Sequence, residues 1–313
     1  MFTAAKPTIL LTGKSGQVGG QLLHLLPQLG EVHAYDRRQM DLSKPDEIRS
    51  AIRSVRPTLI VNAAAYTAVD LAESQEAEAR SVNAEAPAVM AKEAKNIGAT
   101  LVHYSTDYIF NGTKGIPYEE SDEPCPQNAY GRTKLEGEQA IQESGVAHLI
   151  FRTAWVYGFE GRNFLLTILR LATQNQKLRV VCDQIGAPTF CGEIANATTR
   201  ILFQLLRESE GLARLADVSG IYHMTAAGEA SWHAFAEAIL EETANSRPSA
   251  PWFAAATNNL PLIADQVIPV PSASYPTPAR RPAYSVLSNS RLARAFSVEL
   301  PGWRTQLHSV FVS

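Results

Sequence analysis

A tyrosine followed four residues later by a lysine, Tyr130 and Lys134, is the pair in this sequence best suited to proton transfer. In a helix, positions i and i+4 share a face, so both side chains would project into the same space. A neighbouring ammonium favours the phenolate, which is expected to lower the pKa of Tyr130 towards neutrality. Such a pair could protonate an alkoxide that forms at a carbonyl carbon. The alternative is an ordinary helix with a surface lysine, so the pair needs partners elsewhere in the chain.

A glycine-rich turn near the N-terminus is typical of dinucleotide-binding proteins. The apolar run 8–12 predicts a buried parallel strand, and Gly13, Gly16 and Gly19 follow it in the spacing GxxGxxG. A leucine-rich helical pattern comes next. Glycines in this position allow a tight turn and close approach to a pyrophosphate, which the helix N-terminus would bind. A plain glycine-rich turn is the alternative, because the spacing differs from the GxGxxG fingerprint.

The second predicted strand ends in residues that bear on the choice of cofactor. Asp36 would hydrogen-bond a ribose hydroxyl and favour NAD, whereas Arg37 and Arg38 could pair with a 2′-phosphate of NADP. Asp41 and Leu42 suggest a turn that reaches the adenine ring, with a helix-capping aspartate as the alternative. The sequence therefore predicts a site ambivalent between NADH and NADPH.

Hydroxyl and acidic side chains gather where a later predicted strand, 100–107, ends. Ligands bind at the carboxyl ends of strands in open α/β sheets, so Thr106 is placed to hydrogen-bond a substrate oxygen. A threonine that only caps the backbone is the alternative. Residues 73–96 predict one long helix. Because strands and helices alternate through the first half, we expect an α/β fold with a doubly wound parallel, Rossmann-type sheet.

The second half of the chain is expected to contribute a smaller lobe. Eight of the 18 prolines fall between Pro248 and Pro282, so this stretch predicts ordered loops without regular structure. We expect residues 1–157 to form the NAD(P)-binding domain, with the chain returning to it around 180–223. Residues 158–313 are expected to form mainly the substrate-binding lobe.

The composition is that of an ordinary soluble globular protein, with 313 residues, 45% hydrophobic and 19% charged. A net charge of −3 gives no reason to expect nucleic acid as a partner. The N-terminus lacks a signal-peptide core, and no apolar run approaches the roughly 18 residues of a membrane span. Cys125, Cys182 and Cys191 lack metal-ligand spacing. They predict free thiols in a reducing compartment, and hence a cytoplasmic protein.

With the glycine motif, Thr106 and the Tyr130–Lys134 pair in this order, the chain resembles the extended short-chain dehydrogenase/reductases. Longer motifs narrow the resemblance, from Thr8 to about Trp303, to the family of dTDP-4-dehydrorhamnose reductases. These motifs are Asn62–Asp70, His103–Tyr108, Phe151–Tyr157, Gln184–Thr189 and Tyr275–Pro282. The resemblance implies that hydride from NADPH or NADH reduces the C4 keto group of dTDP-4-dehydro-β-L-rhamnose to give dTDP-L-rhamnose, a precursor of cell-surface polysaccharide.

The resemblance also implies roles for individual residues. Tyr130 would protonate the alkoxide, Lys134 would lower the pKa of Tyr130 and bind the nicotinamide ribose, and Thr106 would hold the carbonyl oxygen. Asp107 and Trp155 match positions that contact the sugar. Positions matching cofactor contacts are Gly16, Gln17, Val18, Asp36, Asp41, Leu42, Ala65, Tyr66, Thr67 and Tyr104.

Two arginines near the C-terminus, Arg280 and Arg281, are candidates for binding the diphosphate or the thymidine, since guanidinium groups suit phosphate. A surface salt bridge is the alternative for either one.

Two other functions fit part of the pattern. Another sugar-nucleotide epimerase or dehydratase would share the fold, NAD and the Tyr–Lys pair. Dehydratases typically carry Asp-Glu directly after the strand threonine, whereas Asp107 and Tyr108 follow it here. A non-catalytic NADP-binding regulatory subunit, like that of methionine adenosyltransferase, is the second alternative. All three catalytic groups are present in this chain, so nothing favours a loss of activity.

The chain departs from the resembled family at a metal site. Several members gather magnesium at a subunit contact with glutamates from the first helix, the Gly-Ala-Pro-Thr loop and the C-terminus. Here Gln21 stands in the first helix, Glu193 near the loop is shifted by one residue, and residues 307–313 contain no acid. A single carboxylate is a poor site for a hard dication. We therefore expect no metal and a monomer or weak homodimer.

Overall fold

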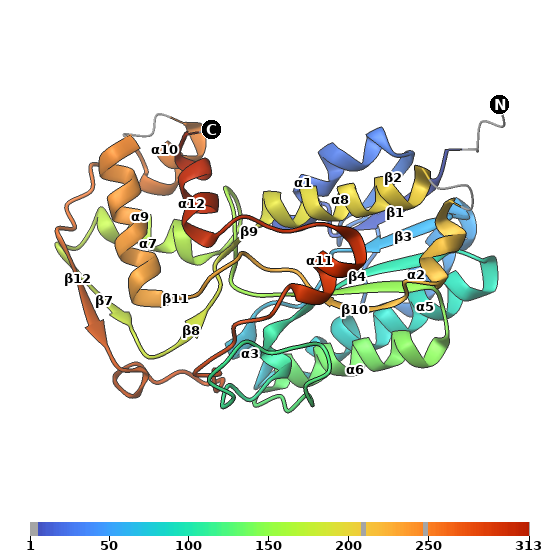
Figure 1. Cartoon of the computed structure of the whole chain (residues 1–313), viewed down its shortest axis with the longest axis horizontal. Coiled ribbons are helices and arrows are strands. Elements are labelled where there is room, and N and C mark those ends of the chain that lie inside the picture. The colour runs from blue at the N-terminus through green and yellow to red at the C-terminus, as the bar shows by residue number, and fades with distance from the viewer. Residues whose placement is uncertain (1–5, 208–210, 247–249, 313) are drawn as a thin grey trace.

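The computed structural model of the chain describes residues 6–207, 211–246 and 250–312. The N-terminal residues 1–5, Pro248 and Ser313, on which parts of the sequence expectations rest, lie outside these ranges. Within them, a larger part built on a parallel sheet lies beside a smaller, mostly helical lobe (Figure 1).

The larger part is organised around a six-stranded parallel sheet of order β10-β5-β4-β3-β1-β2. Its strands are β1 (Thr8–Thr12), β2 (Glu31–Tyr35), β3 (Leu59–Asn62), β4 (Thr100–Thr106), β5 (His148–Thr153) and β10 (Gly220–His223). Every residue of β3, β4 and β5 is buried, which explains the apolar run in each strand, although β4 and β5 also bury polar side chains such as His103 and Arg152. The predicted doubly wound α/β fold is confirmed. The strand order reverses between β1 and β3, where such sheets bind their ligands.

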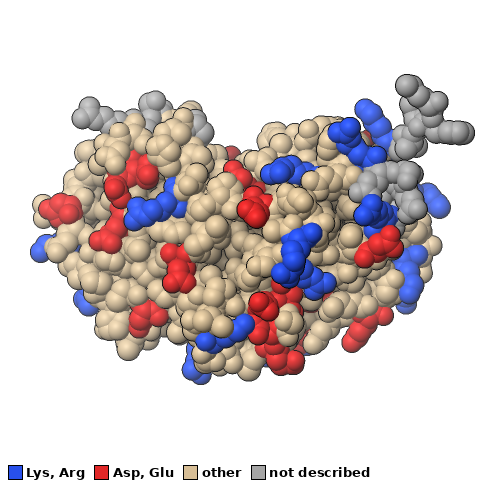
Figure 2. Space-filling view, in the orientation of Figure 1, with Lys and Arg blue, Asp and Glu red and all other residues tan. Residues whose placement is uncertain are grey.

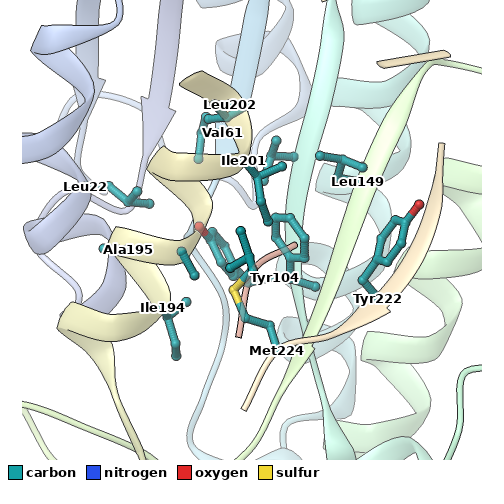
Figure 3. Packing of buried hydrophobic residues seen from close by; sticks show 14 of the residues in the cluster. Leu22, Val61, Tyr104, Leu149, Ile194, Ala195, Ile201, Leu202, Tyr222 and Met224 are labelled. Carbon is teal, nitrogen blue, oxygen red and sulfur yellow. The ribbon is translucent and has the colours of Figure 1, made fainter. Parts of the chain in front are cut away.

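Helices cover both faces of this sheet (Figure 1). α1 (Gln17–Leu25) and α8 (Cys191–Arg207) pack on one face, and α2 (Pro45–Val55), α5 (Ala86–Ile97) and α6 (Ala129–Ser144) on the other. Successive strand residues point to opposite faces, so Ile9 and Leu11 pack with α1 and α8, whereas Leu10 packs with α2 and α5. Figure 3 shows Ile194, Ala195, Ile201 and Leu202 of α8 over the first of these faces.

The smaller lobe has its own apolar core. It contains α7 (Phe164–Ala172), α9 (Trp232–Ser246), α10 (Pro251–Thr257) and α12 (Trp303–Val312), together with β7 (Lys177–Val181) paired to β12 (Gln266–Val270). Two short pairs, β6 (Val156–Tyr157) with β9 (Thr189–Phe190) and β8 (Ile185–Gly186) with β11 (Ala230–Ser231), complete the strands. Between β12 and α12, the chain returns to the larger part, where α11 (Ser290–Phe296) packs beside β10.

The expectation of one long helix over 73–96 is wrong only at its start, because residues 73–75 are not helical, and helical structure then runs without a break from Glu76 to Ile97. The chain forms α3 (Val69–Ala72), α4 (Glu76–Arg80), a π-helical turn (Ser81–Glu85) and then α5. Pro87 lacks the N–H that would bond the carbonyl of Asn83, and a π turn accommodates that gap. The Asn83 backbone also touches α6, where a Cβ on Gly137 would lie 2.1 Å from its carbonyl oxygen. Tertiary packing therefore reshapes the helix.

The expectation that 248–282 lacks regular structure is also wrong, since α10 and β12 lie within it. Pro251 stands in the first turn of α10, where a missing N–H costs nothing. Pro269 lies in β12, a strand that pairs on one side with β7. Proline is tolerated in such edge strands.

Candidate active site

The glycine turn between β1 and α1 is shaped by close backbone contacts. Gly13 has φ +73°, and a Cβ on it would lie 2.7 Å from the backbone nitrogen of Ala64. A Cβ on Gly19 would lie 2.1 Å from the Gly13 carbonyl oxygen. Among the described residues, no side chain caps α1 at Gly16, and its first turn has no acidic residue. The first N–H groups of α1 are therefore available to phosphate oxygens.

A cavity of about 610 Å³ opens at the carboxyl ends of the central strands, against this turn. It brings together most of the residues predicted to bind the cofactor, along with the catalytic pair. These are Gly13, Gly16, Gln17, Val18, Asp36, Arg37, Asp41, Leu42, Ala65, Tyr66, Thr67, Tyr104, Tyr130 and Lys134. Gly19 lies behind the turn, where it permits helix–turn packing. Thr106, Asp107, Trp155, Arg280 and Arg281 are not among the lining residues that the structure describes.

Sequence reasoning missed a wall of this cavity formed by Glu160, Gly161 and Arg162. Asn163 anchors that loop by donating to Gln17 Oε1 at 3.0 Å and to the Gly158 carbonyl at 3.0 Å. The loop directly follows the sequence motif that ends at Tyr157, and this position was the signal that could have predicted its place in the cavity wall. A basic residue so placed could contact a phosphate group.

At the far end of the cavity, the acids and arginines predicted to set cofactor preference already contact one another. Asp36 Oδ1 accepts from the backbone N–H groups of Arg38 at 2.9 Å and Gln39 at 3.3 Å. The exposed Arg37 guanidinium lies 3.4 Å from a Glu78 carboxylate oxygen and 3.9 Å from one of Asp41. No single charge dominates this end of the cavity.

Asp41 both lines the cavity and caps its own turn, so its position is compatible with an adenosine contact and with the capping role. Its Oδ1 accepts from the backbone N–H of Ser43 at 3.0 Å and from the Ser43 hydroxyl at 2.8 Å. The Ser43 backbone hydrogen bond is the main cause of the lowered pKa of Asp41.

The helix α6, which carries the catalytic pair, begins at a well-defined cap. Asn128 Oδ1 accepts from the backbone N–H of Gly131 at 2.8 Å, while Asn128 Nδ2 donates to the Arg280 carbonyl at 2.8 Å. A Cβ on Gly131 would lie 2.2 Å from the Tyr108 carbonyl oxygen. Glycine here lets α6 approach the end of β4, which brings Tyr130 towards Thr106.

The expectation that Lys134 lowers the pKa of Tyr130 is wrong for the protein without cofactor. Burial raises the pKa of Tyr130 to about 12, with a Thr106 hydrogen bond opposing the shift. Lys134 Nζ instead donates to the Tyr104 carbonyl at 2.6 Å and lies 3.2 Å from His103 Nε2. Its ammonium is therefore directed towards β4. A raised pKa keeps the phenol protonated near neutral pH, the form that a proton donor needs.

Thr106 and Asp107 lie together at the end of β4. The Thr106 hydroxyl accepts from the Tyr108 backbone N–H at 3.2 Å and donates to Asp107 Oδ1 at 3.0 Å. Asp107 Oδ2 is buried and meets no hydrogen-bond partner in the described part of the chain. Burial raises the pKa of Asp107 to about 6. The Ser285 side chain opposes that rise in pKa without making a hydrogen bond of normal geometry to Oδ2, so this oxygen can still accept from a ligand hydroxyl.

Trp155 is held in an unusual conformation, with φ +47°. Its indole stacks on Trp232 with ring centroids 3.4 Å apart and planes at 3°. A Cβ on Gly186 would lie 2.4 Å from the same indole, so glycine is required beneath it. Trp155, Gly186 and Trp232, which are far apart in the sequence, thus form one flat aromatic surface.

The two C-terminal arginines differ in their surroundings. Arg281 donates to the Asp70 carboxylate at 2.8 and 3.1 Å, so it forms the salt bridge considered as its alternative. The side chain of Arg280 is exposed, and its backbone carbonyl supports the cap of α6.

Surface charge and metal-ligand chemistry are unremarkable in the described regions. Basic and acidic side chains are interspersed over the face shown in Figure 2. No helix among the described residues is long and apolar enough to cross a membrane. Within residues 6–207, 211–246 and 250–312, no group of three or more His, Cys, Asp or Glu side chains could hold a metal ion. Gln21 lies on α1, and Glu193, which is partly buried, lies on α8.

Comparison with known proteins identifies close relatives over nearly the whole chain. Residues 7–313 match the family described as the RmlD substrate binding domain. A dTDP-4-dehydrorhamnose reductase of Burkholderia thailandensis is 48% identical over 296 residues, covering 95% of each chain. The structure of such a reductase from Clostridium acetobutylicum has a TM-score of 0.84 at 32% identity, covering 97% of this chain and 98% of that one. One from Bacillus anthracis, in complex with NADP, has a TM-score of 0.83 at 30% identity, covering 98% and 99%.

Proposed function

Because the chain belongs to the RmlD substrate binding domain family, we infer that it is an enzyme that reduces dTDP-4-dehydrorhamnose with NADPH or NADH. Its product is dTDP-L-rhamnose. The observation that carries this function is the meeting of Tyr130, Thr106 and Lys134 at the carboxyl end of β4, beside a cavity of about 610 Å³ built on the glycine turn.

The cavity fits a dinucleotide on the evidence of its own backbone. In the glycine turn, backbone atoms approach Gly13 and Gly19 so closely that a Cβ on either residue would clash. The N-terminus of α1 faces the cavity through Gly16, Gln17 and Val18. These residues would bind the pyrophosphate, and Asp36, Arg37 and Asp41 would hold the adenosine ribose. When bound, the nicotinamide supplies the hydride for the C4 carbonyl.

Tyr130 is the proton donor in this proposal. Its raised pKa keeps the phenol protonated, and the adjacent Thr106 hydroxyl fixes its direction. Tyr130 would donate to the substrate oxygen on which negative charge develops, and the Thr106 hydroxyl would turn from Asp107 Oδ1 to donate to the same oxygen. The O–H bond of Tyr130 breaks as the new O–H bond of the sugar forms.

The substrate would be held by groups that do not line the 610 Å³ cavity, at the end of β4 and on the smaller lobe. The unpartnered Asp107 Oδ2 would accept from a sugar hydroxyl, and the Trp155–Trp232 stack would offer a flat apolar surface to the sugar or base. The exposed Arg280 is the better candidate for the diphosphate, because Arg281 is engaged by Asp70.

The division of labour between the two parts follows. Residues 1–157, joined by a returning segment within 180–223, would bind the cofactor, and 158–313 would supply most of the substrate site. α8 and β10 lie in the returning segment and complete the sheet and its cover. The exposed free thiols of Cys125 and Cys182 suit a reducing compartment, which supports a cytoplasmic enzyme.

One assay tests the function against its alternatives. NADPH consumption is followed after addition of the dTDP-4-keto sugar, and the product is identified by mass and proton NMR. Stoichiometric oxidation with formation of dTDP-L-rhamnose is expected. An epimerase or dehydratase would return a changed sugar without net NADPH consumption, and a regulatory subunit would bind NADPH and turn over nothing.

A further inference from the structure

A line of buried polar side chains runs behind Lys134, across the carboxyl ends of three neighbouring strands. Thr12 of β1 donates to Asn62 Oδ1 at 2.7 Å, and Asn62 Nδ2 lies 3.0 Å from His103 Nδ1. His103 Nε2 lies 3.2 Å from Lys134 Nζ. The strand register places Thr12 opposite Asn62 and Asn62 opposite His103. All four side chains are 1% exposed, so water does not compete for these contacts.

The direction of each hydrogen bond is fixed by a backbone group. The Ala64 N–H donates to Asn62 Oδ1 at 3.3 Å, which assigns the oxygen of that amide. Asn62 Nδ2 must then donate to His103 Nδ1, which accepts through its lone pair. Burial holds the pKa of His103 well below its usual range, so the imidazole is neutral whichever form Lys134 takes. A neutral imidazole that accepts at Nδ1 carries its proton on Nε2.

That proton points at Lys134. An ammonium group has three N–H donors and no lone pair, whereas a neutral amine can accept one hydrogen bond and still donate. Lys134 Nζ donates one hydrogen bond to the Tyr104 carbonyl at 2.6 Å. It can also accept the His103 N–H only if it is a neutral amine, because the ammonium has no lone pair. We propose that His103 is a positioning residue that stabilises the neutral amine form of Lys134.

The other groups around Lys134 leave this role to His103. Glu138, one turn further along α6, favours the ammonium, but its carboxylate is paired with Arg152 of β5 at 2.7 Å. Asp107 at the end of β4 is itself held towards its neutral form by burial. Tyr130, on the same helix, is a neutral phenol with a raised pKa. Burial lowers the pKa of Lys134 to about 8, in the same direction as the His103 contact.

The consequence for catalysis rests on the proposed function. Once Tyr130 has given its proton to the sugar alkoxide, the phenolate must regain one. Lys134 in its ammonium form can supply that proton, which leaves a neutral amine and a neutral phenol, while His103 stays neutral throughout. Because the His103 N–H stabilises that amine, it favours proton return to Tyr130.

The first test uses the enzyme without cofactor or substrate, so its outcome does not depend on the activity. Imidazole ¹H–¹⁵N correlation spectra report which ring nitrogen carries the proton, and the signal of His103 is assigned by its loss in His103→Gln. His148 and His223 are internal references, since each faces a backbone carbonyl through Nδ1, at 2.8 and 3.1 Å, and must be protonated there. We expect His103 alone of these three to be protonated on Nε2, and Lys134 to titrate about two units below the surface lysines.

If the proposal is right, Asn62→Asp should reverse the tautomer of the His103 imidazole. The new carboxylate accepts from Nδ1, so the His103 proton moves there and Nε2 becomes an acceptor for the ammonium. The pKa of Lys134 should then rise by about one unit or more. The limb of the pH–rate profile that reports this pKa should shift to higher pH by the same amount. His103→Gln should move the same limb upwards. The proposal is overturned if wild-type His103 is protonated on Nδ1, if Lys134 titrates with the surface lysines, or if neither variant moves the titration.

Discussion

Arg152 of β5 and Glu138 of α6 form a two-armed salt bridge, with Nε–Oε1 and Nη2–Oε2 distances of 3.0 and 2.7 Å. Their side chains are only 2% and 0% exposed. The bridge ties the helix that carries Tyr130 and Lys134 to the sheet one turn beyond Lys134. The catalytic pair is therefore held by an interaction that lies wholly outside the cavity.

Glu138→Ala should lower the free energy of unfolding by about 3–5 kcal/mol, because it leaves the Arg152 charge buried and unpaired. Urea unfolding followed by circular dichroism measures the change. The matched control is Glu136→Ala, which removes the partly exposed partner of Arg80 on the same helix and should cost at most about 1 kcal/mol. Equal effects of the two substitutions would contradict a special role for the buried pair.

Tyr130→Phe should reduce turnover by about 10²–10⁴-fold while NADPH still binds, because it removes the proton donor and keeps the ring. Turnover is measured with the dTDP-4-keto sugar, and NADPH binding by fluorescence or calorimetry. Tyr222→Phe removes a hydroxyl that donates to the Val218 carbonyl outside the cavity, and should leave turnover unchanged. Near-normal turnover of Tyr130→Phe would rule out the assigned role.

Lys134→Ala should both slow turnover and weaken NADPH binding, because one amino group is proposed to serve the proton transfer and the ribose. Steady-state kinetics and NADPH calorimetry on the same preparation separate the two effects. A loss of turnover with unchanged NADPH affinity would contradict the second role.

The sequence predicted the sheet well because its central strands are buried and each carries a short apolar run, such as Leu59–Val61 in β3 and Leu149–Phe151 in β5. It also brought Tyr130 and Lys134 together, since local helix geometry alone fixes that relation. It did not predict the neighbours of Lys134. Asn62 and His103 are 41 residues apart and meet through strand register, which no local pattern encodes.

Other differences arose where tertiary contacts overruled local preference. The helix expected over 73–96 contains a π turn at the point where Asn83 packs directly on Gly137. Arg281 forms a salt bridge with Asp70, which lies 211 residues away in the sequence. The pKa of Tyr130 moved opposite to expectation because burial outweighs a lysine whose amino group is turned towards the Tyr104 carbonyl.

Both cofactors should be used, with less than about a hundredfold preference in kcat/KM, or roughly 2.7 kcal/mol. The reason is that a 2′-phosphate would have to compete with Glu78 and Asp41 for Arg37, while Asp36 is partly occupied by its own loop. Steady-state kinetics with NADH and NADPH test this. Arg37→Ala should shift the preference towards NADH, and strict use of either cofactor by the wild type would count against the prediction.

Asp107 should make stability depend on pH in the acidic range. Its pKa is raised from 3.8 to about 6 in the folded protein, so the folded state holds this proton more tightly than the unfolded state. The stability contributed by this group is fully present below about pH 4 and is lost as the pH rises through about 6. Asp107→Asn lacks the titration, so its stability relative to wild type should increase over that window by on the order of 3 kcal/mol. Urea unfolding of both proteins at several pH values is the measurement, and a pH-independent difference would contradict it.

The final prediction concerns Gln21 and Glu193, at the positions where the family resemblance implies a magnesium site between subunits. Gln21 on α1 offers a neutral amide, a poorer ligand for a hard dication than a carboxylate. Burial raises the pKa of Glu193, which disfavours the charged form that magnesium needs. We therefore expect a monomer or a weak dimer that requires no metal. Light scattering should give a mass near 34.1 kDa at low concentration, and EDTA should change neither that mass nor the turnover. A tight dimer that dissociates on chelation would show that other side chains have replaced the missing glutamates.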